Sequence, residues 1–201
     1  MSQRSSDPAA ERRAGSASAT TQTSASVRAV DGLVEYQVLT VNVVGDESFL
    51  SEPLRVVAPG MEQTVTPDQS ALEHVEHGYT GGGYLRLTRD ASTVVTIPVS
   101  VARDGVYAID VRYANGNGPV NTEDKVAVRT LLVDGDTTGV LVMPQRGAGR
   151  WSEWGWSNAL QLRLKSGQHA LRIVYTPLDR NMNGRENTAL LDAIRLTLLG
   201  H

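Results

Sequence analysis

The chain concentrates its tryptophans in one short stretch. All three lie between Arg150 and Asn158, in the sequence RWSEWGWSN, whereas the whole chain has a single phenylalanine. An indole ring can stack on the C–H face of a sugar ring, and it can equally fill a hydrophobic core. The place of each tryptophan relative to the neighbouring strand distinguishes these two roles.

The three tryptophans divide into one that precedes a predicted strand and two that belong to it. If residues 154–164 (WGWSNALQLRL) form one strand, Trp154 and Trp156 share a face with Asn158 and three leucines, which is the core face. Both rings are then compatible with a structural role. Trp151 comes before this strand, in a glycine-containing loop, and is the best candidate for a stacking platform.

Three loops of the sequence are rich in asparagine. An asparagine amide carries a donor and an acceptor in one plane, which matches adjacent sugar hydroxyl groups without the desolvation cost of a full charge. Asparagine is also an ordinary turn residue, because it tolerates positive φ. Since three such loops accompany the tryptophans, we expect a carbohydrate site with Trp151 and Trp154, and with Tyr113 at the end of a core strand. The asparagines expected to bind the sugar are Asn115, Asn117, Asn121, Asn158, Asn183 and Asn187.

Asp192 is a carboxylate in an apolar segment. In residues 189–199 (ALLDAIRLTLL) it alternates onto the same face as Leu190, Ile194, Leu196 and Leu198. An isolated buried charge is very costly, so the carboxylate needs a partner. A calcium ion, an arginine or a set of backbone N–H groups would each serve.

The segments that position these groups are predicted to be β-strands almost throughout. Apolar and polar residues alternate in segments such as TVVTIPVSV and GVYAIDVRY, and turns such as VDGD and KSG separate them. We therefore expect an all-β sandwich over residues 60–201. Residues 31–59 contain a predicted β-hairpin. Residues 1–30 are rich in Ser, Ala and Thr, lack a hydrophobic period and are expected to be a disordered tail.

Composition excludes several classes of function. The formal charge of −3 and the pI of about 5.8 give no basic surface for nucleic acid. No stretch approaches the ~18 consecutive apolar residues of a membrane span, and the N-terminus lacks the apolar region of a signal peptide. The absence of cysteine excludes disulfides and thiolate metal sites. A glycosidase needs two carboxylates facing each other across a cleft, and nothing in the sequence selects such a pair.

The order of several motifs resembles the carbohydrate-binding modules of families 6 and 35. These motifs are GYTGGGY, GVYAIDVRYANGNG, LLVDG, RWSEWGWSNALQLRLKSGQHALRIVY and LLDAIRL, and they cover roughly residues 78–199. The resemblance implies a jelly-roll or galactose-binding-like β-sandwich, appended to a secreted bacterial glycoside hydrolase. It therefore implies an extracellular or periplasmic location, with polysaccharide or oligosaccharide and a catalytic glycosidase domain as partners. The hairpin segment looks like the last two strands of a fibronectin type III domain.

The same resemblance implies roles for individual residues. In that family the sugar site lies at the loop end of the sandwich. The resemblance therefore implies that Trp151 binds the sugar, together with Asn115 or Asn117 and with Asn183 or Asn187. A structural calcium is typically held by two first-strand glutamates and by an aspartate that opens the last strand, here Asp192. This chain lacks the E-A-E motif at its first strand; Glu62, Asp68 and Glu73 are substitutes among which the sequence does not choose.

The leading hypothesis is a non-catalytic carbohydrate-binding module that brings a glycoside hydrolase to polysaccharide. The alternatives are a structural β-sandwich domain of a multidomain glycosidase, without a sugar site of its own, and a glycoside hydrolase. A sandwich of this size rarely carries a deep catalytic cleft at its end, which disfavours the enzyme.

Overall fold

Two long strands form the centre of the protein. β6 (Gly105–Ala114) and β12 (Ala189–Gly200) pair antiparallel, with Ile109 opposite Leu196. Alternate residues of β6, from Tyr107 to Tyr113, face the core as their period-two pattern predicts. The computed structural model describes residues 33–51, 54–67, 71–90, 94–118, 125–180 and 187–200.

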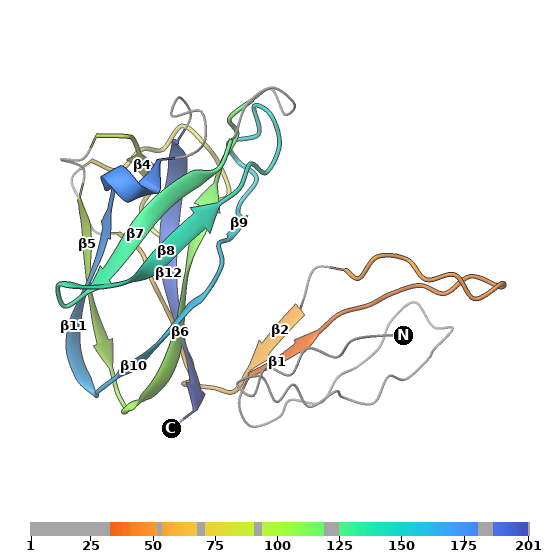
Figure 1. Cartoon of the computed structure of the whole chain (residues 1–201), viewed down its shortest axis with the longest axis horizontal. Coiled ribbons are helices and arrows are strands. Elements are labelled where there is room, and N and C mark those ends of the chain that lie inside the picture. The colour runs from red at the N-terminus through yellow and green to blue at the C-terminus, as the bar shows by residue number, and fades with distance from the viewer. Residues whose placement is uncertain are drawn as a thin grey trace.

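Two antiparallel sheets pack face to face around this centre, in the body on the left of Figure 1. One sheet has the order β10-β6-β12-β3, with β4 paired to β12 and β9 paired to β6, and the other has the order β5-β11-β7-β8. The main core lies between them, so the predicted all-β sandwich is confirmed. The remaining elements of the sandwich are β3 (Glu62–Val65), β4 (Leu85–Leu87), β5 (Val95–Val101), β7 (Ala127–Val133), β8 (Asp136–Met143), β9 (Gly155–Trp156), β10 (Leu160–Leu164), β11 (Gly167–Val174) and the short 3-10 helix η1 (Pro177–Asp179).

A β-bulge interrupts the alternation of β12 at Asp192. Leu191 lies opposite Tyr113 and Ala193 lies opposite Arg112, so Asp192 is an extra residue between them. The prediction that Asp192 shares one face with Ile194 is therefore wrong. The bulge shifts the phase, and Leu191, rather than Leu190, joins Ile194 in the main core.

The prediction of a single strand over residues 154–164 is also wrong, because one strand ends at Trp156 and another begins at Leu160. β9 pairs with β6 through Trp156 and Arg112, whereas β10 pairs with β6 further along, from Leu160 onward. Trp156 consequently lies on the outer face of the sheet, where its ring stacks 3.7 Å from the Arg195 guanidinium.

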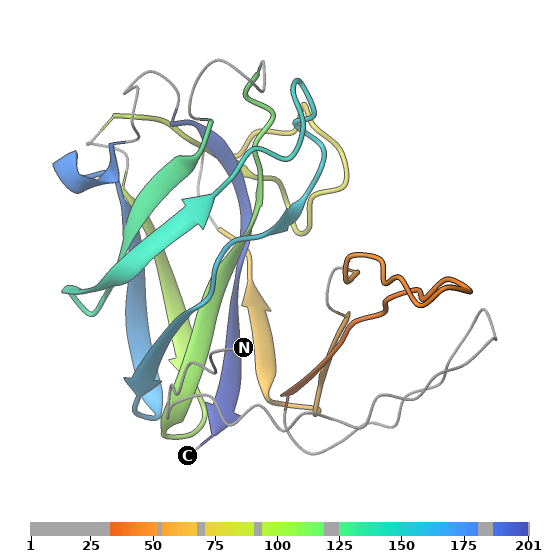
Figure 2. The same ribbon diagram turned by 45° about the vertical axis from the view of Figure 1, so that its right-hand side comes forward.

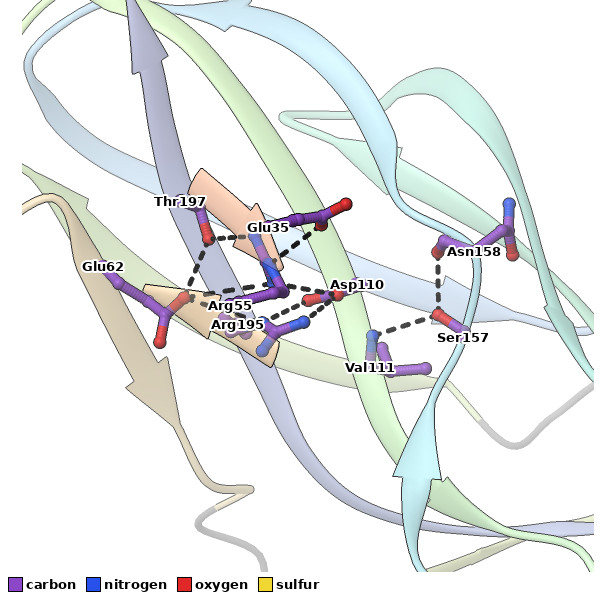
Figure 3. Close-up of polar contacts among 9 residues, drawn as sticks. All are labelled: Glu35, Arg55, Glu62, Asp110, Val111, Ser157, Asn158, Arg195 and Thr197. Carbon is purple, nitrogen blue, oxygen red and sulfur yellow. Dashed lines mark hydrogen bonds and ion pairs between the residues drawn. The ribbon is translucent and has the colours of Figure 1, made fainter. Parts of the chain in front are cut away.

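The predicted hairpin is present and is attached to the sandwich by charge. β1 (Leu33–Tyr36) pairs with β2 (Leu54–Val57), and Arg55 of β2 reaches the outer face of the β6–β12 pair (Figure 3). Its Nη1 lies 3.6 Å from Asp110 Oδ2, and its Nη2 donates to Thr197 Oγ1 at 3.3 Å. Arg195 also binds Asp110 with two donors, and its Nε lies 2.9 Å from Oδ1. We call Arg55, Asp110, Arg195 and Thr197 the hairpin clamp.

Residues 37–51 extend the hairpin into an arm that projects away from the sandwich (Figure 2). Its apolar side chains contact little: Val43 and Phe49 are fully exposed. Phe49 is therefore a fully exposed aromatic residue of this arm.

Candidate functional site

Two loops meet at the end of the sandwich, as Figure 2 shows for the yellow segment 71–84 and the cyan segment 144–154. Ser152 Oγ donates to Glu76 Oε2 at 2.7 Å, and the backbone N–H of His77 donates to Ser152 Oγ at 3.2 Å. His77 Nδ1 also lies 3.1 Å from the same hydroxyl oxygen. The serine thus holds the two loops together at a polar cluster.

Trp151 lies beside this cluster and is half-buried. One face of its indole covers Gly116, because a Cβ atom added at Gly116 would lie 2.8 Å from three ring atoms. Gly116 separates two predicted sugar-binding asparagines, so the ring is beside the first asparagine loop, as a platform requires. The ring also borders an open pocket. The other residues that line this pocket are Glu76, His77, Gly149, Arg150, Ser152 and Glu153.

A cation, the guanidinium of Arg86, lies near the Trp151 ring. The Arg86 guanidinium lies 5.8 Å from the ring centroid and is held by Glu73 through hydrogen bonds of 2.9 and 2.8 Å. These bonds raise the pKa of Arg86 above its ordinary value, so the group stays charged. A fixed cation near an indole is attracted to the negative face of the ring and helps to hold it in place.

Trp154 and Tyr113 lie behind this surface. The Trp154 ring lies 5.5 Å from the Tyr84 ring, in a small apolar cluster that Trp151 also joins, and Trp154 Nε1 donates to the carbonyl oxygen of His77 at 2.7 Å. Tyr113 is buried in the main core, with its hydroxyl group bound to the carbonyl oxygen of Pro144. Sequence analysis expected both at the sugar, whereas the structure gives them supporting positions beneath the loops.

Two of the predicted asparagines are buried and fully used in structural hydrogen bonds. Asn115 is 0% exposed, and its amide donates to the carbonyl oxygens of Lys125 and Met143 at 2.7 and 2.9 Å. Its Oδ1 accepts from the side chain of Asn117, which also donates to the carbonyl oxygen of Thr188 at 2.8 Å. These amides join the loops to one another and have no free group for a ligand.

Asn187 has the same structural role on the other side of the loops. Its Oδ1 accepts from the backbone N–H of Val128 at 2.8 Å and from Arg129, and its amide donates to the carbonyl oxygen of Asp179. Burial lowers the pKa of Arg129 to about 10. The guanidinium is nevertheless well bound, because it also donates to the carbonyl oxygen of Thr88 at 2.7 Å.

Asn158 is exposed but its amide is paired with β8. Oδ1 accepts from the N–H of Val142 at 2.7 Å, and Nδ2 donates to the carbonyl oxygen of Val140 at 2.9 Å. The side chain therefore links the segment between β9 and β10 to β8 of the other sheet. Asn121 and Asn183 lie outside the described residues, so their expected sugar contacts stay predictions.

Asp192 has the arginine and N–H partners that sequence analysis gave as alternatives to calcium. Oδ1 accepts from the N–H of Thr80 at 2.7 Å, while Oδ2 accepts from Thr80 Oγ1 at 3.0 Å and from Arg112. Within the described part of the chain, no three acidic, His or Cys side chains gather as metal ligands would. Glu62 lies by the hairpin clamp and Glu73 binds Arg86, while Asp68 is outside the described residues. The described residues at Asp192 thus do not form a set of calcium ligands.

Sequence analysis missed Glu76, His77 and Ser152, which line the pocket. Glu76 and His77 lie in the segment EHVEHGYTGGGY, which resembles a solvated loop followed by turns. Ser152 is 76 positions from Glu76, and only the fold brings the two together. The one feature of the sequence that could have indicated Ser152 is the neighbouring Trp151.

Comparison with known proteins identifies the fold. No protein-family profile matches the chain. A curated cycloisomaltooligosaccharide glucanotransferase from Niallia circulans is 27% identical over 113 residues, which cover 54% of this chain and 11% of that enzyme. A Paenibacillus cycloisomaltooligosaccharide glucanotransferase, solved with cycloisomaltoheptaose, matches with a TM-score of 0.54 and 26% identity over 70% of this chain and 18% of that one.

A carbohydrate-binding module that was solved by itself also matches the fold. The family 35 carbohydrate-binding module of Abf62 from Cellvibrio japonicus superposes with a TM-score of 0.51 and 16% identity, over 68% of this chain and 92% of that one. The chain has the fold of a family 35 carbohydrate-binding module. Within this fold, the Trp151 pocket lies among the loops at one end of the sandwich. In the residues that the structure describes, no helix has the length and apolar character required to cross a bilayer.

Proposed function

We propose that the protein is a non-catalytic carbohydrate-binding module whose sugar site is the pocket beside Trp151. One observation carries this proposal: the partly buried indole of Trp151, seated on Gly116, forms one wall of an open pocket that polar side chains line. A sugar ring placed there would stack its C–H face on the indole. Its hydroxyl groups would reach Glu76, Ser152 and His77.

The pocket is open and its charges are solvated, which favours weak binding over catalysis. Glu153 is 55% exposed and faces Arg150, which is 68% exposed, at 3.5 Å. A glycosidase instead needs an acid and a second carboxylate on the two sides of an enclosed bond. A shallow site with few contacts gains little beyond the cost of ordering its ligand, so we expect dissociation constants near 0.1–1 mM.

Isomaltooligosaccharides are the first ligands to test. Two of the similar proteins are cycloisomaltooligosaccharide glucanotransferases, and one of them was solved with cycloisomaltoheptaose. This chain corresponds to about a tenth of the curated enzyme's length. We therefore propose that the module serves a catalytic domain of a polysaccharide-active enzyme outside the cell, and holds that enzyme on its substrate.

Affinity electrophoresis and titration calorimetry against a panel of glucans test the proposal. Trp151→Ala removes the platform and should abolish retardation on every glycan that retards the wild type. Phe49→Ala is the matched control, because it removes an aromatic side chain that is fully exposed in the arm. Equal retardation of wild type and Trp151→Ala would exclude this pocket as the site.

A structural module without a sugar site is the second candidate. The buried amides of Asn115 and Asn187 favour it, since the structure uses them to join loops instead of leaving them free. This candidate predicts that the wild type migrates normally in every gel of the panel. Retardation by any one glycan that Trp151→Ala removes decides against it.

A further inference from the structure

We propose that Arg112 takes the place of a bound calcium ion at Asp192, and that this metal-free charge pair positions the Gly78–Thr80 corner beside the Trp151 pocket. Arg112 would replace the metal whether or not the protein binds sugar, whereas its effect on the pocket rests on the proposed function.

The Asp192 carboxylate is completely satisfied by this chain. It is 0% exposed, and its two oxygen atoms accept from the N–H and the hydroxyl group of Thr80 and from Arg112. The guanidinium supplies the positive charge that a buried carboxylate requires. A cation entering the same place would have to displace Arg112 or lie against it, and either arrangement brings two positive charges together.

Further acidic ligands for a metal are also missing from the described residues around Asp192. Calcium takes 6–8 oxygen ligands, usually with more than one carboxylate. Thr80 and Arg112 already occupy the oxygen atoms of Asp192. Glu62 and Glu73, the candidate partner acids that the structure describes, are engaged elsewhere, the first 3.8 Å from Arg195 and the second bound to Arg86.

Arg112 also binds the corner directly. Nη1 and Nη2 each donate to the carbonyl oxygen of Gly78 at 3.1 Å, and the guanidinium lies 5.5 Å from the Trp154 ring centroid. Gly78 has a φ of 78°, a conformation that favours glycine. Trp154 in turn donates to the carbonyl oxygen of His77, the residue before the corner. One arginine thus joins Asp192 to the segment that carries the polar wall of the pocket.

The metal part of the proposal is tested on the wild-type chain by its melting temperature in EDTA and in millimolar CaCl2. We expect the two values to agree within about 1 °C. A rise of several degrees with calcium that Asp192→Asn abolishes would overturn the proposal. A rise that Asp192→Asn leaves unchanged arises at another place and leaves Arg112 as the partner of Asp192.

The charge pair is tested by the double-mutant cycle of Arg112→Ala and Asp192→Asn. Arg112→Ala leaves a buried carboxylate without its cation, and we expect its melting temperature to fall by about 10 °C. The double variant should fall by clearly less than the sum of the two single variants. Additive effects would overturn the pairing, and the calcium titration decides the metal question even where a variant fails to fold.

The positioning of the corner is tested by sugar affinity. Arg112→Lys keeps the charge but cannot reach Asp192 and Gly78 together, because an ammonium lacks the fork of a guanidinium. We expect Arg112→Lys to bind calcium no better than wild type and to bind sugar several-fold more weakly, in a folded protein. Unchanged affinity would overturn the positioning role. Loss of binding in the wild type itself would refute the proposed function and leave the metal result intact.

Discussion

Replacing Asp110 by asparagine should destabilise the protein strongly, because it removes the anion at the centre of the hairpin clamp. Asp110 is 5% exposed and Arg195 is 8% exposed, and two hydrogen bonds join them. Arg55 lies 3.6 Å from the same carboxylate. Removing one partner of a buried ion pair typically costs about 3–5 kcal/mol, since the other charge stays behind.

The remaining contacts place the expected loss at the lower end of that range. Arg195 keeps the Trp156 ring at 3.7 Å and Glu62 at 3.8 Å, and the Glu62 side chain is 30% exposed. These groups still stabilise part of the Arg195 charge after Asp110 is neutralised. We therefore expect Asp110→Asn to lower the free energy of unfolding by about 3 kcal/mol.

Urea unfolding followed by tryptophan fluorescence measures this loss, because Trp156 lies on Arg195 and reports on the clamp. Asp136→Asn is the matched control: Asp136 is exposed on β8, so its effect should stay within about 0.5 kcal/mol. A loss below about 1 kcal/mol for Asp110→Asn would show that the clamp is no stronger than a surface ion pair.

Two further predictions concern pH and the platform. The bond to the Lys165 carbonyl oxygen and the pair with Asp134 raise the pKa of His169 above its ordinary value. Its contribution to stability is therefore complete below about pH 6.5 and is lost as the pH rises through the raised value. The melting temperatures of wild type and His169→Gln should differ more at pH 5.5 than at pH 8.5; equal differences would contradict this assignment. Gly116→Ala places a Cβ 2.8 Å from the Trp151 ring, so the ring must shift and sugar affinity should fall about tenfold. Gly82→Ala, whose Cβ has its nearest neighbour at 3.9 Å, should bind as wild type does in the same calorimetric titration, and equal binding by both variants would show that the ring position is irrelevant.

The sequence predicts the sandwich well because a β-strand has a period of two that burial makes visible. Val95, Ile97, Val99 and Val101 alternate without interruption, and all four are buried. The same rule failed at Asp192, where a one-residue bulge changes the phase of β12. The bulge depends on how β12 pairs with β6, so it cannot be predicted from the sequence of β12 alone.

The candidate site is only partly readable from sequence for a related reason. Trp151 was singled out because it precedes the predicted strand; it borders the pocket and is partly buried, and its role as a sugar platform stays a prediction. An asparagine amide has the same chemistry whether it meets a sugar or a buried carbonyl group, so the sequence could not show that Asn115 is internal. Glu76 and Ser152 were missed because their hydrogen bond joins distant parts of the chain.

The hairpin clamp fixes the position of the β1–β2 hairpin relative to the pocket. The clamp binds β12 at Thr197, whereas the pocket loop 71–84 leads into β4, whose first residue Leu85 lies opposite Leu191 of the same strand. Six residues of extended strand separate these two points by about 20 Å. β12 therefore sets the distance between the hairpin and a sugar bound in the pocket.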